Sequence, residues 1–234
     1  MSSTEPPVVA RMKKLVQGWE QRSDHKAIFL RCYLMMTSNM LAAIEQHEFN
    51  DPAWVNKLLD LFADYYFAAL TAYQQSPVSA PAVWQLAHNS ANDPQVTTLQ
   101  LLLLGVNAHI NYDLVLTLVD LLKPEWAGLS TSQRSWRYSD HCKVNEVIGR
   151  TTDAVQDQII GPGMPFMNWI DKLLGPIDEF LISHLISHWR ESVWQNATHL
   201  LDMNEASDQA LLISQLEEDA LRLGRIITGL DFVI

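Results

Sequence analysis

The sequence is short of cysteine and of basic residues, and each shortage argues against a class of protein. Cys32 and Cys142 are the two cysteines among 234 residues, and neither belongs to a paired metal-ligand motif. We therefore expect reduced thiols, as in a cytoplasmic protein. The 27 acidic residues outnumber the 16 lysines and arginines, which gives a formal net charge of -11. Such a charge argues against electrostatic binding of nucleic acid or of anionic lipid.

Several local signatures of other folds and chemistries are missing as well. The sequence contains no Asn-Gly or Asp-Gly hairpin turn and no alternating strand pattern. It has no Gly-x-Ser-x-Gly elbow and no glycine-rich phosphate loop, which argues against serine-type nucleophilic catalysis and classical nucleotide chemistry. The first residues contain no long apolar core behind a basic leader, so no secretory signal is expected.

Helix punctuation, by contrast, recurs along the chain. Asp51 and Asp93 each precede a proline, the arrangement typical of an N-cap followed by the first helical residue. We predict an all-α protein that forms one domain over residues 1–234, with a break at 161–165 and an irregular connection at 123–138. Helices are predicted near residues 5–21, 24–47, 52–75, 80–90, 94–122, 139–160, 165–174, 176–203 and 207–228.

The central run of the chain, residues 101–122, reads LLLLGVNAHINYDLVLTLVDLL. Polar residues in the middle of such a run would be costly in lipid, so we expect a helix buried in protein and no membrane insertion. Successive helical residues are about 100° apart, which places Asn107 and Asn111 on one side and His109 and Asp113 on nearly the opposite side. Because leucines flank both pairs, this helix, at about 94–122, is expected to be surrounded by others.

His109 and Asp113 are the first candidates for a functional site. Being one helical turn apart, they can point an imidazole nitrogen and a carboxylate at one metal ion. The alternative is a buried His–Asp hydrogen bond that only fixes the helix. For Asn107 and Asn111, capping of loops or bridging to neighbouring helices is favoured over contact with a substrate or cofactor. Each pair needs a partner, because an uncompensated buried amide or carboxylate costs several kcal/mol.

The segment ISHLISHWRESVWQN supplies a second set of candidates. His184, His188 and Glu191 share one helical stripe, and two imidazoles with a carboxylate suit zinc, iron or manganese. A solvated helix face of this composition is the alternative. Facing helices of a bundle can build a metal site between them. We therefore predict a zinc or iron ion between the central helix and the helix that carries His184 and His188. The predicted ligands are His109, Asp113, His184 and His188.

Three further residues are candidates for catalysis. Asp140 either caps a helix that starts near Ser139 or acts as a base or added ligand, and the catalytic role is also open to Glu191. Arg190 and Trp194 lie one turn apart, and cation–π packing is the first interpretation of this pair. The second is that Arg190 holds a carboxylate or phosphate group of a small ligand.

The central motif GVNAHINYDL resembles the hallmark of an uncharacterised bacterial family, domain of unknown function 5995. The blocks FLRCYLMMT, DPAWVNKLLDLFADYYFAAL, DHCKVNEVI and RESVWQNA look like its other blocks, so the resemblance covers roughly residues 25–205. The positions that match its pattern are Asn107, His109, Asn111, Asp113, Asp140, Asn145, Arg190 and Trp194. His184 and His188 do not match. The resemblance implies a fold class and no established activity, and it adds Asn145 and Trp194 to Asn107 and Asn111 as candidate binding residues.

A looser similarity, in helical architecture and His-x-x-x-Asp spacing alone, is to the zinc-dependent bacterial phospholipases C. The tryptophan that those enzymes carry at a processed N-terminus is missing here, which puts the full zinc cluster in doubt. We expect a cytoplasmic, metal-dependent enzyme that acts on a small molecule by hydrolytic or Lewis-acid chemistry. An iron oxygenase and a non-catalytic helical ligand-binding or interaction protein are the alternatives. The amphipathic C-terminal helix could pack on a second subunit as a homo-oligomer.

Overall fold

A computed structural model describes residues 5–159 and 179–229 of the chain. Within these ranges the regular structure is helical throughout, which confirms the predicted all-α class. The predicted break at 161–165, the predicted helix at 165–174 and the last residues, 230–234, lie outside the described residues.

The described helices follow the predicted order, with several shifted ends. The α-helices are α1 (Pro7–Glu20), α2 (Ala27–Glu45), α3 (Pro52–Gln75), α4 (Ala82–Ser90), α5 (Thr98–Asn107), α6 (Leu114–Leu122), α7 (Thr131–Ile159), α9 (Glu179–Asp202) and α10 (Ala206–Gly229). Two short 3₁₀ turns, η1 (Pro77–Ser79) and η3 (Trp126–Gly128), lie in connections, and a π-helical segment, η2 (Ala108–Asp113), joins α5 to α6.

The start of α3 is built as predicted. The Asp51 carboxylate accepts a hydrogen bond from the backbone N–H of Trp54 at 3.0 Å, and Pro52 occupies the first helical position. The side chain thereby satisfies one of the backbone donors that a helix leaves unpaired at its N-terminus.

The predicted helix start at Asp93 is wrong. The Asp93 carboxylate instead accepts from the backbone N–H of Gln95 at 2.9 Å, within a turn. The helix begins only at Thr98, because Thr97 and Gln100 form a capping box. The Thr97 hydroxyl accepts from the N–H of Gln100, and the Gln100 side chain accepts from the N–H of Thr97. Two backbone donors are satisfied reciprocally, whereas a single Asp satisfies one.

The connection before α7 is shorter than predicted. Ser130 and Gln133 form the same kind of reciprocal pair, with Gln133 Oε1 accepting from the Ser130 N–H at 2.9 Å. The helix therefore begins at Thr131, and the predicted start at Ser139 and Asp140 lies inside it. The Ser-x-x-Gln signature of a capping box at Ser130 therefore marks this helix start, and Asp140 does not.

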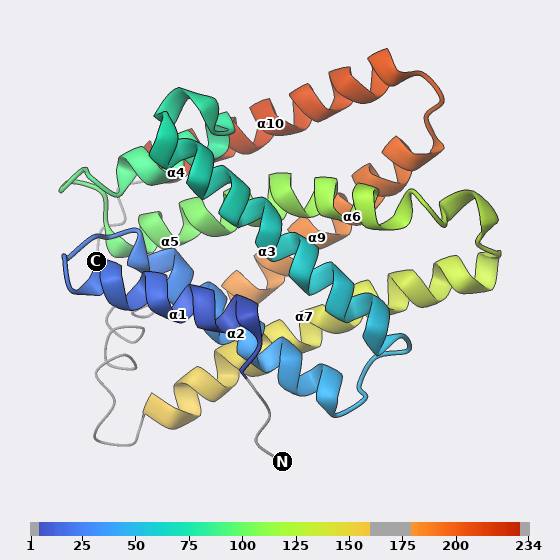
Figure 1. Cartoon of the computed structure of the whole chain (residues 1–234), viewed down its shortest axis with the longest axis horizontal. Helices are drawn as coiled ribbons and strands as arrows, with labels where there is room; N and C mark the ends of the chain where they lie inside the picture. Colours follow the sequence, from blue (N-terminus) through green and yellow to red (C-terminus); the bar gives the residue numbers. More distant parts are fainter. Residues whose placement is uncertain (1–4, 160–178, 230–234) are drawn as a thin grey trace.

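The central helix is continuous from Thr98 to Leu122 and is surrounded by other helices, as predicted. It contacts α2, α3, α4, α9 and α10. In Figure 1, α3 crosses in front of it, and α10 lies above it. By length and composition alone, α2 and this helix could each cross a membrane, and 44% and 56% of their apolar windows are buried inside the bundle.

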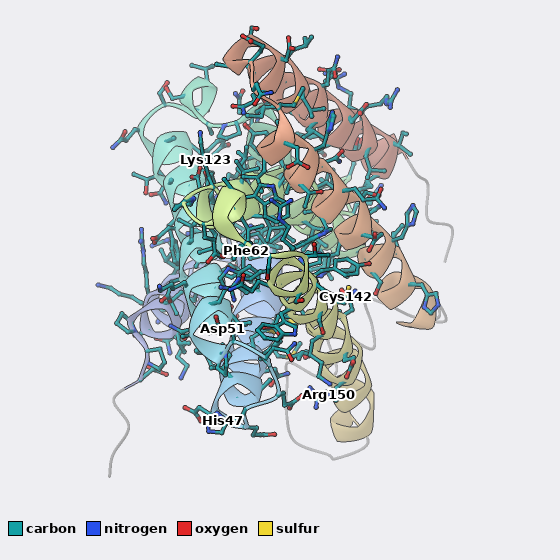
Figure 2. All side chains as sticks on the ribbon, turned by 90° about the vertical axis from the view of Figure 1, so that its right-hand side faces the viewer. His47, Asp51, Phe62, Lys123, Cys142 and Arg150 are labelled. Atoms are coloured by element: carbon teal, nitrogen blue, oxygen red, sulfur yellow. The ribbon has the colours of Figure 1, made fainter. Side chains whose placement is uncertain are left out.

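Two groups of buried apolar side chains form the core, and they meet at the central helix. One lies around α6, α7 and α9 and includes Leu118 and Leu122. The other lies around α1, α2 and α4 and includes Leu30. Phe62 and Val106 pack against both groups. Figure 2 shows Phe62 inside the bundle, whereas charged side chains project from its edge.

Gly105 is a point of close approach between the central helix and α2. A Cβ added at Gly105 would lie 2.5 Å from Cδ2 and 2.7 Å from Cβ of Phe29. We expect Gly105→Ala to lower the free energy of unfolding by about 1–3 kcal/mol, as overpacking does in a closely packed core. Urea denaturation followed by circular dichroism measures this change.

Gly18→Ala in α1 is the matched control. There the added Cβ would meet only the end of the Arg22 side chain, at 4.0 Å. Alanine has the higher helix propensity, so this variant is expected to gain up to about 1 kcal/mol. A gain in both variants would contradict the tight contact of Gly105 with Phe29.

Candidate functional site

The π-helical segment contains the two central candidates. Residues Ala108–Asp113 form this turn within the otherwise α-helical run, and such π segments occur frequently at functional sites. His109 and Asp113 are 2% and 1% exposed. The predicted polar pair is therefore fully inside the bundle.

His109 and Asp113 bond to each other, and Trp84 completes the group. His109 Nδ1 lies 3.0 Å from Asp113 Oδ2, and Trp84 Nε1 donates to the same oxygen at 2.9 Å. An indole N–H can only donate, so Oδ2 is an acceptor. The contact between Oδ2 and His109 Nδ1 is a hydrogen bond with either tautomer of the ring. Because Oδ2 already accepts from Trp84, we assign Asp113 as the acceptor of this bond too, which places the ring proton on Nδ1 and a lone pair on Nε2.

Burial sets the charge of this pair. It lowers the pKa of His109 well below its usual value, so the imidazole is neutral at neutral pH. Burial also raises the pKa of Asp113, and the Trp84 N–H opposes that rise by stabilising the ionised form. A neutral imidazole with a free Nε2 can accept a proton or bind an electrophile.

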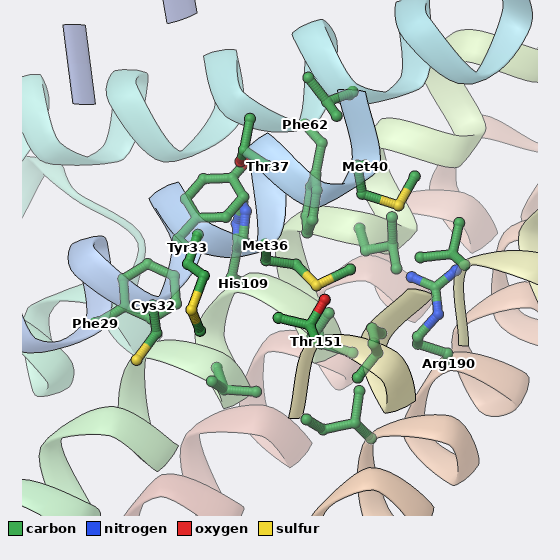
Figure 3. Close-up of a pocket in the computed structure, with 18 of the residues that line it drawn as sticks. Phe29, Cys32, Tyr33, Met36, Thr37, Met40, Phe62, His109, Thr151 and Arg190 are labelled. Carbon is green, nitrogen blue, oxygen red and sulfur yellow. The ribbon is translucent and has the colours of Figure 1, made fainter. Parts of the chain in front are cut away.

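His109 reaches a cavity of about 230 Å³ at the junction of the two core groups (Figure 3). Its walls come from α2, α3, α5, η2, α6, α7 and α9, and they are almost entirely apolar. The apolar side chains include three methionines, Met35, Met36 and Met40, and several leucines, among them Leu58, Leu59 and Leu103. A cavity of about 150 Å³ suffices to bind benzene, so this one has room for a larger organic molecule.

Three polar atoms of cavity-lining residues are buried and have no hydrogen-bond partner within the described part of the chain. They are His109 Nε2, the Tyr33 hydroxyl and the Thr37 hydroxyl. Tyr33 and Thr37 lie one turn apart on α2, and the Tyr33 ring centroid is 4.4 Å from that of His109. Burial raises the pKa of Tyr33 well above its usual value, so its hydroxyl stays protonated. Buried polar atoms are normally paired, and three unpaired ones around one cavity point to a bound molecule or water.

Aromatic rings hold the imidazole in place. The Phe62 ring stacks on His109 with centroids 3.5 Å apart and planes 4° from parallel. Phe29 meets the imidazole in a T-shaped contact at 5.8 Å. With Nδ1 bonded to Asp113 and one face of the ring stacked on Phe62, Nε2 has a fixed direction.

Arg190 lies on another part of the same wall (Figure 3) and is 3% exposed. Its Nε donates to Asn145 Oδ1 at 2.7 Å, and its Nη2 donates to the backbone oxygen of His141, also at 2.7 Å. Trp194 packs on the His141 ring, with centroids 5.1 Å apart. Burial lowers the pKa of Arg190 to about 10, so it remains charged at neutral pH.

Asp140 serves as an anchor between helices. It is 1% exposed and accepts three hydrogen bonds, from the N–H and the side-chain amide of Asn50 and from the N–H of Asp51, at 2.7–2.9 Å. It therefore holds α7 to the residues that lead into α3. It does not line the described cavity.

The four predicted metal ligands are not brought together. His109 and Asp113 are buried, whereas His184 and His188 are exposed on α9. Among the described residues, no group of three or more His, Cys, Asp or Glu side chains is placed to hold a metal ion. Glu191 lies outside the cavity lining and accepts hydrogen bonds from the side chains of Tyr138 and Gln195. Helical spacing predicts which residues share a helix face, but it does not predict that the face of α9 with His184 and His188 points to solvent.

Asn107 bridges the central helix to α10, as favoured from the sequence, whereas Asn111 bonds to Asn107 within the central helix. Asn107 Nδ2 donates to the backbone oxygen of Ala220 in α10 at 2.8 Å, and Asn111 donates to Asn107 Oδ1 at 2.8 Å. Neither residue lines the cavity described above.

Sequence reasoning missed Tyr33 and Thr37. The signal was present, because the two hydroxyls lie four residues apart in the apolar run FLRCYLMMT, as His109 and Asp113 do in theirs. The role of Trp84 as the donor to Asp113 had no local signal, since 29 residues separate the two.

The fold and the site define an all-helical protein whose central helix contributes a carboxylate-bound histidine to the lining of an apolar cavity. The family model described as a family of unknown function (DUF5995) matches residues 6–230. The chain belongs to this family, as its central motif indicated. Searches of curated proteins and of solved structures gave no match.

Proposed function

We propose that the protein is an acid–base enzyme that acts on a small, largely apolar carbonyl compound bound in the cavity. The observation that carries this proposal is the unpartnered Nε2 of His109, fixed through Nδ1 by Asp113 and Trp84. A neutral imidazole held in this way is suited to remove a proton. The apolar walls suit the body of such a substrate.

The proposed reaction is proton abstraction beside the carbonyl group. His109 Nε2 takes a proton from the adjacent carbon, and the electron pair moves to the carbonyl oxygen. The Tyr33 and Thr37 hydroxyls donate hydrogen bonds to the resulting enolate oxygen. Such hydrogen bonds stabilise a developing charge more strongly in apolar surroundings than in water. Asp113 stabilises the imidazolium that forms. Return of the proton to the same or another carbon completes an exchange or an isomerisation.

Deuterium exchange of 2-octanone in D₂O, followed by proton NMR, tests this proposal. The wild-type protein is expected to accelerate exchange beside the carbonyl, and His109→Gln is expected to reduce that acceleration by about 10²–10⁴-fold, the usual contribution of a general base. His47→Gln removes an exposed histidine and is expected to behave as wild type. Equal rates for wild type and His109→Gln would contradict the proposal, as would ketone binding without any acceleration.

A second candidate function keeps the predicted metal. A metal-bound histidine usually donates its other ring N–H to a carboxylate, and the His109–Asp113 bond has this form. In that case Nε2 would be the ligand and Asp113 its hydrogen-bond partner, in place of the direct ligation expected from the sequence. Elemental analysis of untagged protein tests this candidate, with about one equivalent of zinc or iron expected in wild type and none in His109→Gln.

A further inference from the structure

Arg190 carries a buried positive charge that no described acidic side chain neutralises. Its hydrogen-bond partners are Asn145 and the backbone oxygen and ring Nδ1 of His141, and all of them are neutral. The two nearby acids of the sequence are engaged elsewhere, since Glu191 binds Tyr138 and Asp140 binds the start of α3. Burial of an unpaired charge is costly, and a charge retained at that cost calls for an anion.

The residues that line the cavity indicate which kind of anion pairs with Arg190. Arg190 is the one cationic side chain among the described lining residues, and that lining contains no aspartate or glutamate. Its Nη1 makes no hydrogen bond to the described residues, so part of the planar fork is free for a further acceptor. A carboxylate matches this fork in shape and carries one negative charge. A phosphate dianion would keep one charge uncompensated in the same apolar surroundings.

We propose that the molecule bound in the cavity is an apolar monocarboxylate whose head group pairs with Arg190. This inference rests on the cavity invoked in the proposed function and narrows its substrate to an apolar oxo acid, with the carboxylate at Arg190 and the carbonyl group at His109. Benzene, with six non-hydrogen atoms, fits a cavity of about 150 Å³. At the same volume per atom, a cavity of about 230 Å³ holds roughly nine or ten non-hydrogen atoms. That is the size of octanoate.

Calorimetric titration with octanoate and with 1-octanol tests the inference directly. The two probes share a chain length and differ in the charged head. Wild type is expected to bind octanoate at least 10-fold more tightly, and Arg190→Gln is expected to lose that preference. Arg150→Gln removes an exposed arginine of the same charge and is expected to bind octanoate as wild type does. Equal affinity for the two probes in wild type, or no binding of octanoate, would overturn the inference.

A measurement on wild-type protein covers the case in which Arg190→Gln does not fold. The Nε–H resonance of Arg190, observed by ¹H–¹⁵N NMR, is expected to shift on saturation with octanoate and to stay in place with 1-octanol. An unshifted resonance at saturation with octanoate would place the head group elsewhere and overturn the inference.

Failure of this inference is separable from failure of the proposed function. If octanoate is not preferred while His109 still accelerates exchange of 2-octanone, which is neutral, the carboxylate assignment alone falls. If octanoate binds through Arg190 and no ketone exchange occurs, the catalytic role alone falls.

Discussion

Replacement of Asp113 by asparagine is expected to reduce acceleration of 2-octanone exchange by about 10²–10⁴-fold, close to the loss in His109→Gln. If the oxygen of the new side-chain amide accepts from the Trp84 N–H, the amide N–H₂ faces His109 Nδ1, which lies 3.0 Å from the carboxylate in the wild type. The imidazole then accepts at Nδ1 and carries its proton on Nε2. The nitrogen that faces the cavity thus becomes a donor and can no longer remove a proton.

Asp120→Asn is the control for this variant. Asp120 lies on the same helix, is exposed, and accepts a hydrogen bond from the Tyr65 hydroxyl at 2.6 Å. Its replacement is expected to leave the exchange rate unchanged. Wild-type exchange by a folded Asp113→Asn protein would show that the carboxylate does not direct the His109 proton.

Replacement of Asp140 by alanine is expected to lower the free energy of unfolding more than Gly105→Ala does. The carboxylate accepts three hydrogen bonds while 1% exposed, and its loss leaves the Asn50 and Asp51 N–H groups without their acceptor. Hydrogen bonds to charged groups contribute about 1.5–3 kcal/mol each, so we expect a loss of about 3 kcal/mol or more. For a protein of this size, that loss lowers Tm by roughly 6–12 °C.

Scanning calorimetry of Asp140→Ala and Asp219→Ala checks this result. Asp219 is exposed and pairs with Arg222 one turn away, so its loss is expected to change stability by less than about 1 kcal/mol. Below its Tm, Asp140→Ala is expected to retain ketone exchange. A variant with unchanged Tm and abolished exchange would instead assign Asp140 the catalytic role first considered from the sequence.

Features that depend on one helix could be predicted from the sequence. The spacing of His109 and Asp113 within an apolar run correctly indicated a buried pair on a central helix, because residues four apart share a helix face. The Asp51 cap was predicted from the Asp51–Pro52 pair, a signal that is likewise local to one helix. The starts at Asp93 and near Ser139 were wrong, since a single acidic residue was weighed above the reciprocal Thr97–Gln100 and Ser130–Gln133 capping boxes.

Features that depend on how helices face each other could not be predicted. The stripe of His184 and His188 is real, but nothing in its spacing tells whether it faces the core or solvent. Likewise, the contact of Trp84 with Asp113 and the neutral surroundings of Arg190 arise only when α4, α7 and α9 pack on the central helix. The cavity itself is made by residues of seven helical segments, none of which signals it alone.

The site depends above all on which ring nitrogen of His109 bears the proton. Long-range ¹H–¹⁵N NMR of histidine-labelled wild-type protein at neutral pH measures this, with His109→Gln identifying the resonance. We expect a neutral ring with Nδ1 protonated and Nε2 bare, and the reverse tautomer in Asp113→Asn. A wild-type ring that is protonated on Nε2, whether neutral or charged, would leave no base in the cavity and would contradict the proposed chemistry.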